Sequence, residues 1–279
     1  MDYNYKCLSI AGFDGSGGAG LQADLKTFSA FGCHGMTVLS ALPIQNTMGV
    51  YNCYEIPLKT IQEQLEAIFE DIIPNSIKIG MLFSSKNIKL IAKFLRQYAQ
   101  NIPIVLDPVM VAKSGNLLLL PEAIKTLKTD LIPLSTIITP NLPESYALTK
   151  KVEDMRMLAQ GLLELGSKAV LLKGGHLTGE NSDDLYLDNK GNSVLLKSQR
   201  INSKNTHGTG CTLSAAIAAG LARNLDLIEA CKTAKRYLFN ALNSAKNCSI
   251  GKGNGPLDHF YFLKHKKCLF TRHYRNVIR

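Results

Sequence analysis

The chain has 279 residues, of which 46% are hydrophobic and 19% are charged, and its formal net charge is +10 at pH 7. This composition is typical of an ordinary globular protein, and the length excludes a miniprotein too small to form its own core. No apolar run reaches the roughly 20 residues that a membrane span needs, which excludes a transmembrane protein.

The N-terminal segment and the cysteines indicate a cytoplasmic protein. The first six residues lack a basic region followed by an apolar stretch and a small-residue cleavage site, so no secretory signal is predicted. The seven cysteines occur singly, with no C-x-x-C pair that would indicate a zinc site or a redox motif. Scattered cysteines of this kind fit reduced thiols in the cytoplasm.

Strand-like runs rich in apolar and β-branched residues alternate with amphipathic segments along most of the chain. The predicted strands are Cys7–Ala11, Met36–Leu42, Ile77–Met81, Ile102–Leu106, Thr136–Thr139 and Ala169–Lys173. The predicted helices are Gly20–Phe31, Leu58–Ile72, Asn87–Gln100, Pro121–Leu131, Glu144–Lys150 and Met155–Leu165. Such repeats join parallel strands by crossover helices, and continuously hydrophobic strands are typical of a sheet covered on both faces. The pattern predicts an α/β fold with a mostly parallel central sheet.

Beyond residue 180 the pattern changes. The runs Asp184–Leu187 and Ser193–Lys197 predict an antiparallel hairpin on the edge of the sheet. Two helices are predicted after it, Thr209–Leu221 and Leu227–Ala245. Because no internal repeat, low-complexity block or Pro/Ser-rich linker divides the chain, we expect one domain, residues 1–263, followed by a tail, residues 264–279.

The tail is strongly basic. It holds six Lys or Arg residues and no acid, and without them the net charge falls from +10 to +4. A basic segment can bind nucleic acid or an anionic membrane, but this one is short, terminal and without a periodic aromatic pattern. We therefore expect a solvated or subunit-contacting tail, and neither a nucleic acid nor a membrane as partner.

Glycines cluster first between the first predicted strand and the first helix. Gly15, Gly17 and Gly20 satisfy the spacing G-x-G-x-x-G, but Met36–Thr47 contains no acidic residue for the ribose hydroxyl of a dinucleotide. No G-x-x-x-x-G-K-[ST] motif occurs either, which excludes a P-loop enzyme. We interpret the cluster as a turn that lets a ligand approach the backbone, followed by a helix that carries Asp24. The alternative is a turn that only packs.

A second glycine cluster opens the helix predicted to begin at Thr209. Gly208 and Gly210 leave the backbone N–H groups of its first turn uncovered, and the helix dipole adds partial positive charge there, which suits a phosphate. Cys211 lies in this turn, where the same field is expected to lower the pKa of its thiol, so that a thiolate could accept a proton from a substrate hydroxyl. The alternatives are a small buried thiol beneath the helix and a nucleophilic pair with His207.

Three charged residues are predicted at strand ends or just beyond them. They are Asp107, Glu144 and Lys173. Because ligands bind beyond the carboxyl ends of parallel strands, we expect these charges to share one edge of the sheet. Two carboxylates and a lysine beside a phosphate-binding helix end suit Mg²⁺-assisted phosphoryl transfer, through metal ligation and neutralisation of charge. Each residue alone could instead be a helix cap or part of a surface ion pair.

The motifs follow one another in a distinctive order. The blocks are Ala11-Gly12-x-Asp14-x-Ser16-Gly17-Gly18-Ala19-Gly20-x-Gln22-Ala23-Asp24, Gln45-Asn46-Thr47-x-Gly49-Val50, Lys78-Ile79-Gly80-Met81-Leu82, Asp107-Pro108-Val109-Met110, Thr139-Pro140-Asn141-x-x-Glu144, Lys173-Gly174-Gly175-His176 and Lys204-Asn205-Thr206-His207-Gly208-Thr209-Gly210-Cys211. Together they resemble the hydroxymethylpyrimidine/phosphomethylpyrimidine kinases of thiamine biosynthesis, within the ribokinase-like superfamily. The resemblance runs from about residue 6 to His259 and ends in Gly251-Lys252-Gly253-x-Gly255-Pro256.

This resemblance implies a fold, an activity and a set of site residues. It implies a three-layer αβα sandwich and an enzyme that uses ATP with Mg²⁺ to phosphorylate 4-amino-5-hydroxymethyl-2-methylpyrimidine and then its monophosphate. The residues it implies for the aminopyrimidine are Gly12, Asp24, Gln45, Met81 and Val109. The anion hole under the transferring phosphoryl group would be Gly208, Thr209, Gly210 and Cys211, with Cys211 at the position of the superfamily's aspartate base. Asp107 and Glu144 would serve the magnesium and phosphate region, with Lys173 and Thr209 at the nucleotide.

The resemblance also leaves alternatives and departures. Leu42-Pro43-Ile44-Gln45 replaces the family's usual Thr/Val-Ala-Gln, and Pro43 restricts the backbone before Gln45. Pyridoxal kinase of the same fold is one alternative, and a non-catalytic pyrimidine-binding protein is another. Ala112-Lys113-Ser114-Gly115 is predicted to form a flap that excludes water from the site. Family members are commonly dimers, which implies a homodimer.

Overall fold

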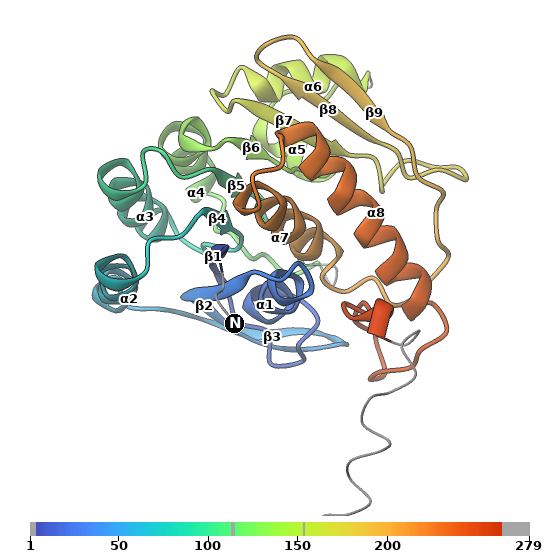
Figure 1. Cartoon of the computed structure of the whole chain (residues 1–279), viewed down its shortest axis with the longest axis horizontal. Coiled ribbons are helices and arrows are strands. Elements are labelled where there is room, and N and C mark those ends of the chain that lie inside the picture. Colours follow the sequence, from blue (N-terminus) through green and yellow to red (C-terminus); the bar gives the residue numbers. More distant parts are fainter. Residues whose placement is uncertain (1–3, 113–114, 153, 264–279) are drawn as a thin grey trace, which may run out of the picture.

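The computed structural model describes residues 4–112, 115–152 and 154–263, and these form a sheet between two groups of helices (Figure 1). Within the described residues the sheet has nine strands, in the order β3-β2-β1-β4-β5-β6-β7-β8-β9. The strands are β1 Lys6–Gly12, β2 His34–Asn46, β3 Gly49–Glu55, β4 Ser76–Ile79, β5 Ile104–Leu106, β6 Ile137–Ile138, β7 Ala169–Lys173, β8 Asp184–Asp188 and β9 Ser193–Leu196. Strands β2, β1, β4, β5, β6 and β7 are parallel, and β8 and β9 form an antiparallel hairpin at one edge. The predicted α/β class and the edge hairpin are confirmed.

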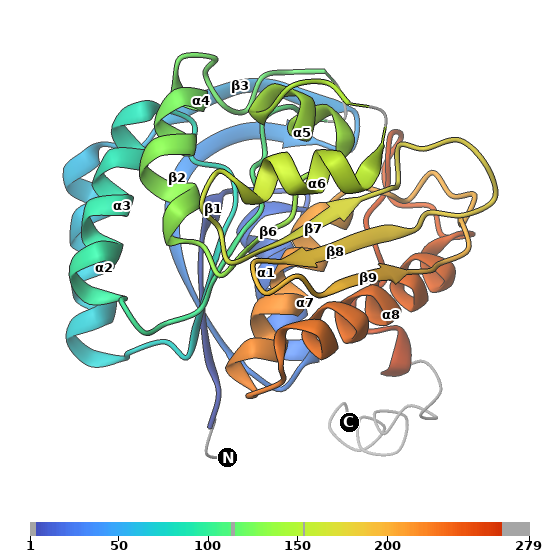
Figure 2. The same ribbon diagram turned by 90° about the horizontal axis from the view of Figure 1, so that it is seen from above.

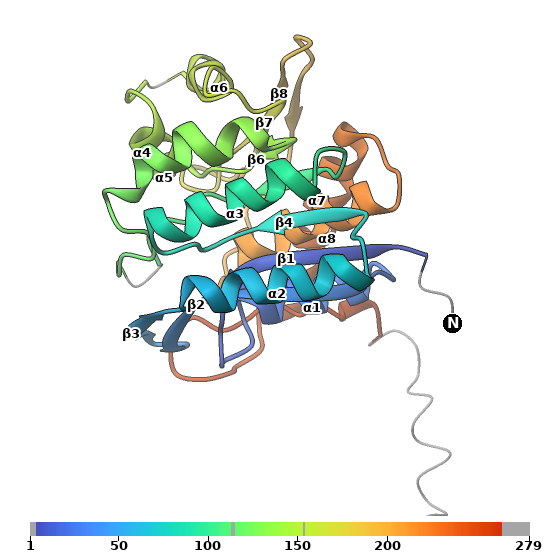
Figure 3. The same cartoon turned by 90° about the vertical axis from the view of Figure 1, so that its left-hand side faces the viewer.

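The helices lie in two layers. They are α1 Gly20–Ala30, α2 Leu58–Asp71, α3 Ser85–Tyr98, α4 Ala123–Thr126, α5 Leu142–Leu148, α6 Met155–Leu163, α7 Thr209–Ala222 and α8 Leu227–Ala245. Helices α1, α7 and α8 cover one face of the sheet, and α2 to α6 cover the other (Figures 2 and 3). Two single-turn helices are also present, η2 Ile132–Leu134 and η3 Tyr261–Leu263. The π-helical turn η1 is described below.

Each helical layer encloses its own core, because successive side chains of a strand point to opposite faces. Leu8 and Ile10 of β1 pack in the core beneath α2 and α3, whereas Cys7 packs in the core with α7 and α8. The same alternation in β4 turns Ile77 into the first core and Lys78 towards α1. A charged side chain therefore enters the interior from the middle of the sheet.

Three elements differ from the sequence prediction. Strand β2 continues past Leu42 and through Pro43 to Asn46, because β3 pairs antiparallel with it at the second edge of the sheet. The sequence does not indicate β3, since its residues are exposed or half-buried and form no apolar run. The helix predicted over Pro121–Leu131 is α-helical only in α4 and continues as a π-helical turn, η1, Leu127–Leu131.

Helix ends decide where backbone groups are free to bind a ligand. The side chain of Asp226 accepts a hydrogen bond from the first turn of α8, and Ser84 does the same for α3. Helix α7 has no such cap: its N-cap is Gly208, in the left-handed conformation with φ of +81°. No side chain therefore caps its first-turn amide groups, although the N–H of Thr209 donates to the carbonyl of Thr206. None of the helices in the described part of the chain combines the length and apolar character that a membrane span needs.

Candidate active site

The two glycine clusters of the sequence meet in the structure. A Cβ atom added to Gly208 would overlap the carbonyl oxygen of Gly18, so the two loops touch backbone to backbone at a position only glycine can occupy. The loop between β1 and α1 thereby lies against the uncapped N-terminus of α7. Both loops lie beyond the carboxyl ends of the parallel strands, where the sequence places a ligand.

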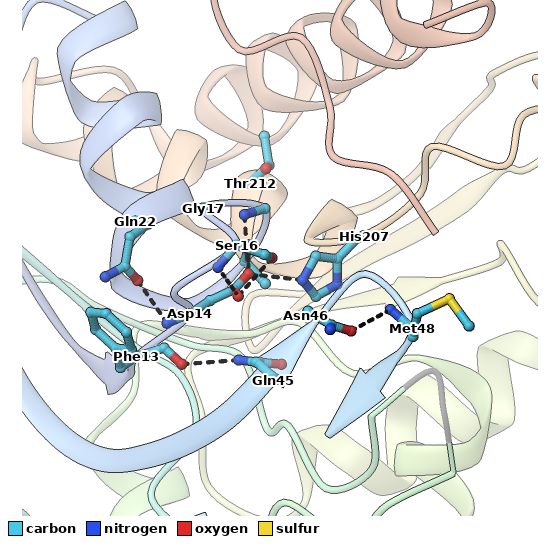
Figure 4. Close-up of polar contacts among 12 residues, drawn as sticks. Phe13, Asp14, Ser16, Gly17, Gln22, Gln45, Asn46, Met48, His207 and Thr212 are labelled. Carbon is cyan, nitrogen blue, oxygen red and sulfur yellow. Dashed lines mark hydrogen bonds and ion pairs between the residues drawn. The ribbon is translucent and has the colours of Figure 1, made fainter. Parts of the chain in front are cut away.

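A buried carboxylate ties these loops together (Figure 4). Asp14 accepts hydrogen bonds from the backbone N–H groups of Ser16, Gly18 and Ala19, and His207 Nε2 lies 2.8 Å from its Oδ2 atom. Burial alone would raise the pKa of Asp14, but the contacts with His207 and Ser16 lower it to about 2. The His207 ring therefore binds the first glycine loop through Nε2, and this places it in a structural tie rather than in the alternative pair with Cys211.

A third glycine segment, residues 251–256, braces the loop before α7. The backbone N–H of His207 donates to the carbonyl of Gly255 over 3.1 Å. Gly253 donates to Thr47 Oγ1 in the β2–β3 turn, and the side chain of Asn205 donates to the carbonyls of Ala245 and Cys248. In the sequence this segment lies within the family resemblance but has no assigned role. In the structure it supports the loop that leads into the N-terminus of α7.

Lys173, Asp107 and Glu144 converge at this edge, as predicted. Lys173 Nζ lies 2.9 Å from Asp107 Oδ1 and 4.0 Å from Glu144 Oε2. Thr139 donates a hydrogen bond to the same Asp107 oxygen. A Cβ atom added to Gly210 would lie 3.1 Å from the other oxygen, Asp107 Oδ2, and 3.4 Å from Lys173 Nζ. The charged cluster therefore faces the first turn of α7.

Glu144 has a structural role as well. It stands at the third position of α5 and forms a capping box with Asn141, in which each residue binds the backbone of the other. Burial raises the pKa of Glu144 to about 7, Lys173 works against this rise, and Asp107 adds to it. The alternative that Glu144 caps a helix is confirmed, and its carboxylate still lies beside Lys173.

A second lysine–carboxylate pair lies deeper. Lys78 Nζ is 2.7 Å from Asp24 Oδ2, and both side chains have no exposed surface. Ser9 donates to the same Asp24 oxygen over 2.6 Å, and Asp24 Oδ1 has no hydrogen-bond partner among the described residues. Burial alone would lower the pKa of Lys78, but the neighbouring carboxylate of Asp24 raises it. The sequence gives Lys78 no role, although a lysine inside a buried apolar strand was the available signal.

Cys211 differs from expectation. Burial raises the pKa of its thiol to about 11, and Asp24 and Asp107 add to this rise, whereas Lys78 and the Gly20 amide act against it. The expectation that the helix field lowers this pKa is wrong, because desolvation and two nearby carboxylates outweigh the first-turn dipole. With its pKa near 11, Cys211 carries a protonated thiol at neutral pH.

The residues expected at the pyrimidine lie around the ends of β1, β2 and β4. A Cβ atom added to Gly12 would lie 3.0 Å from the sulfur of Met81, so these two share one wall. Gln45 donates from its side-chain amide to the carbonyl of Phe13, next to Gly12 (Figure 4). Val109 is half-buried in the segment after β5, while Asp24 is enclosed by its partners. Their binding roles remain predictions.

The donor set suits a metal held mainly by a nucleotide. Within the described residues there is no group of three or more His, Cys, Asp or Glu side chains that could hold a metal ion by itself. Asp107 and Glu144 offer the one or two carboxylates that Mg²⁺ uses alongside substrate phosphates and water.

The predicted flap is described only in part. Its residues Lys113 and Ser114 lie outside the described residues, as does the basic tail. The described Ala112 and Gly115 are joined by a backbone hydrogen bond of 2.9 Å.

Comparison with known proteins agrees with this geometry. The family model for phosphomethylpyrimidine kinase matches residues 14–258. The hydroxymethylpyrimidine/phosphomethylpyrimidine kinase of Salmonella typhimurium is 47% identical over 260 residues, which are 91% of this chain and 97% of that protein.

Two solved structures are also similar. A crystal structure of phosphomethylpyrimidine kinase from Clostridium difficile is 43% identical, with a TM-score of 0.76, and the match covers 85% of this chain and 99% of that one. Pyridoxal kinase from Staphylococcus aureus, solved with AMP-PCP and pyridoxal, is 33% identical, with a TM-score of 0.82 over 92% of this chain and 94% of that one. The chain belongs to the phosphomethylpyrimidine kinase family, and the ribokinase-like fold expected from its motifs is confirmed.

Proposed function

We propose that the chain phosphorylates the hydroxymethyl group of 4-amino-5-hydroxymethyl-2-methylpyrimidine with ATP, and then phosphorylates the monophosphate to the diphosphate for thiamine biosynthesis. The observation that carries the proposal is the meeting of Asp107, Lys173 and the uncapped N-terminus of α7 at one edge of the sheet. Amide groups without a side-chain cap, a positive charge and carboxylates are the parts that a loose phosphoryl-transfer transition state needs.

In this proposal each part of the edge has a task. The first-turn amide groups of α7, from Gly208 to Cys211, bind the transferring phosphoryl group, and Lys173 neutralises charge on the phosphates. Asp107 and Glu144 would hold Mg²⁺, directly or through water, and the ion would offset charge on the nucleotide phosphates. In this proposal Cys211 lies beside the substrate hydroxyl that loses its proton. Because its thiol is protonated at neutral pH, correct positioning of the substrate contributes more to the rate than proton removal by a thiolate.

The pyrimidine would lie between the ends of β1, β2 and β4. Gly12, Met81 and Val109 supply the walls, and the Gln45 amide supplies hydrogen bonds to the exocyclic amine and ring nitrogens. Asp24 acts from inside the wall, where its unpartnered Oδ1 oxygen offers an acceptor. A direct bond from Asp24 requires the substrate to reach past the side chains that enclose it.

The decisive test is an ADP-release assay with MgATP and mass detection of products. The hydroxymethylpyrimidine, its monophosphate and pyridoxal are offered side by side. Conversion of both pyrimidines, ending in the diphosphate, supports the proposal. Turnover of pyridoxal alone moves the assignment to the activity of the Staphylococcus aureus neighbour. Thermal stabilisation by the pyrimidine without any turnover identifies a binding protein instead.

A homodimer and a cytoplasmic location complete the proposal. Strand β3 is an edge strand that exposes Tyr51 and Tyr54, with Met48 exposed in the turn before it, and exposed apolar edges are typical of contacts between subunits. A second copy of the chain, paired through this edge about a twofold axis, would cover them. Light scattering on the wild type and on Tyr51→Lys tests this, because the variant should shift the chain towards monomer.

The proposed cytoplasmic location rests on the cysteines. The six cysteines among the described residues are free, which fits a reducing compartment.

A further inference from the structure

One side chain from another part of the chain makes several hydrogen bonds to the loop that follows Lys173. Residues 175–180 are consecutively exposed and belong to no helix or strand. Arg200, which follows the β8–β9 hairpin, donates to the backbone carbonyls of Gly175, Leu177, Gly179 and Asn181. The distances run from 2.6 to 2.9 Å, and the backbone N–H of Arg200 adds a bond of 2.7 Å to the carbonyl of Glu180.

This arrangement fixes the direction of the loop's peptide groups. Four of the five N–H donors of a guanidinium are used, and its planar fork holds four carbonyls around one point. These carbonyls would repel an anion if they faced outwards. Carbonyl groups carry only partial charges, and Arg200 forms no ion pair with a carboxylate among the described residues. Its formal positive charge therefore remains beside the loop.

The loop is connected directly to the phosphate site. It begins at Lys173, whose Nζ contacts Asp107 and faces Gly210. At its start Gly174 donates to Asp184, which Lys235 also binds, and a side chain on Gly174 would overlap the backbone of Asp183. The base of the loop is thus anchored to β8 and α8, and Arg200 binds its exposed part.

We infer that Arg200 is a positioning residue for the nucleotide, because it shapes residues 174–181 into a wall of the ATP site. Its four hydrogen bonds, rather than its charge, hold this wall in place. The inference rests on the proposed kinase function. Arg200 itself touches neither reacting group.

The test compares Arg200→Lys and Arg200→Met with the wild type. Lysine keeps the charge, but its single ammonium cannot bind four spread carbonyls, so both variants should raise KM for ATP roughly tenfold or more. KM for the pyrimidine should stay within about twofold. The matched control is Lys197→Met, which removes an exposed positive charge at the end of β9 and should behave as wild type. A wild-type KM for ATP in Arg200→Lys, with loss only in Arg200→Met, would show that charge alone matters and would overturn the inference.

Amide hydrogen exchange keeps the test independent of turnover. In both variants the amides of residues 175–181 should exchange faster while both cores stay protected, and added ADP should slow their exchange in the wild type. Unchanged exchange in Arg200→Met would show that Arg200 does not hold the loop. If ADP has no effect on the exchange of this loop, the loop does not line the nucleotide site. If the wild type has no kinase activity, the proposed function fails while the exchange experiment still decides the inference.

Discussion

The sheet carries two lysine–carboxylate pairs of the same chemistry in different surroundings. Lys78 and Asp24 are 2.7 Å apart and wholly buried, whereas Lys173 and Asp107 are 2.9 Å apart with the lysine side chain 14% exposed. A buried pair cannot exchange partners without leaving a charge unpaired in the interior, but a pair at the solvent edge can release its lysine to a phosphate and its carboxylate to a cation. The difference fits the proposed roles, in which the first pair supports the wall of the substrate site and the second takes part in phosphoryl transfer.

Breaking the buried pair should produce the largest effect on folding. Lys78→Met leaves Asp24 charged and unpaired in the interior, and we expect the free energy of unfolding to fall by about 3–5 kcal/mol. Urea unfolding measures the loss. The double variant Lys78→Met/Asp24→Leu should recover much of it, since no charge remains buried. A single variant within about 1 kcal/mol of wild type would contradict the burial of this pair.

Breaking the edge pair should affect catalysis rather than folding. Lys173→Met removes the charge that faces the phosphates, and we expect kcat/KM to fall roughly 10³-fold. The melting temperature should fall less than in Lys78→Met, because the Lys173 side chain is 14% exposed and water can reach this edge, although Asp107 itself is buried. The control is Lys190→Met, an exposed lysine in the β8–β9 turn. Equal losses of stability in Lys173→Met and Lys78→Met would remove the distinction between the two pairs.

Cys211 lies between the two pairs and tests whether a base is needed. Cys211→Ala should lower turnover roughly 10²-fold with little loss of pyrimidine affinity. Because the pKa of the thiol is about 11, thiolate catalysis predicts that the wild-type rate rises with pH between 7 and 10, and that the alanine variant loses this rise. Rates from stopped assays across this range decide the point. Retained turnover in Cys211→Ala would refute the base role.

Glu144 should show the smallest effect, as a change in the magnesium requirement. Its pKa is raised to about 7, so the carboxylate is charged above pH 7 and becomes protonated as the pH falls through it. We expect the Mg²⁺ concentration for half-maximal rate to rise severalfold from pH 8 to pH 6. Glu144→Gln should need more Mg²⁺ throughout and lose this dependence on pH, which separates Glu144 from the titration of ATP itself.

The sign of the linked stability effect follows from the same pKa. A carboxyl whose pKa is higher in the folded protein than in the unfolded chain favours folding when protonated. Its contribution is fully present below the unfolded value of 4.5 and is lost as the pH rises towards 7. Glu144→Gln should therefore be more stable than wild type at pH 8 and similar to it at pH 4.5, as urea unfolding at the two pH values can measure.

The sequence was sufficient where function depends on backbone and strand order. The positions of Lys173, Asp107 and the glycine turn before α7 follow from strands that end at one edge, so their convergence could be predicted. Strand β3 could not, because an exposed edge strand has no apolar run. The bonds that Arg200 and His207 make could not be predicted either, since they join segments that only the fold brings together.

The pKa of Cys211 shows a different limit. Sequence places the thiol at a helix N-terminus, a position that favours a lowered pKa, and this local feature is all that the sequence shows. Desolvation and the charges of Asp24 and Asp107 depend on the whole packed interior, and they reverse the direction. Helices and strands can be predicted from neighbouring residues in the sequence. The pKa of a site residue cannot, because it depends on residues that only the fold brings close.

The brace formed by the third glycine segment also sets when the site can form. Gly253 binds Thr47 across 206 residues of sequence, and His207 binds Asp14 across 193. Contacts between such distant segments close late in folding, because the chain between them must first be ordered. During synthesis the N-terminal elements can assemble before the brace exists. A chain that stops before residue 251 lacks the segment that supports the loop before α7, so we expect activity only when nearly the whole sequence has been made.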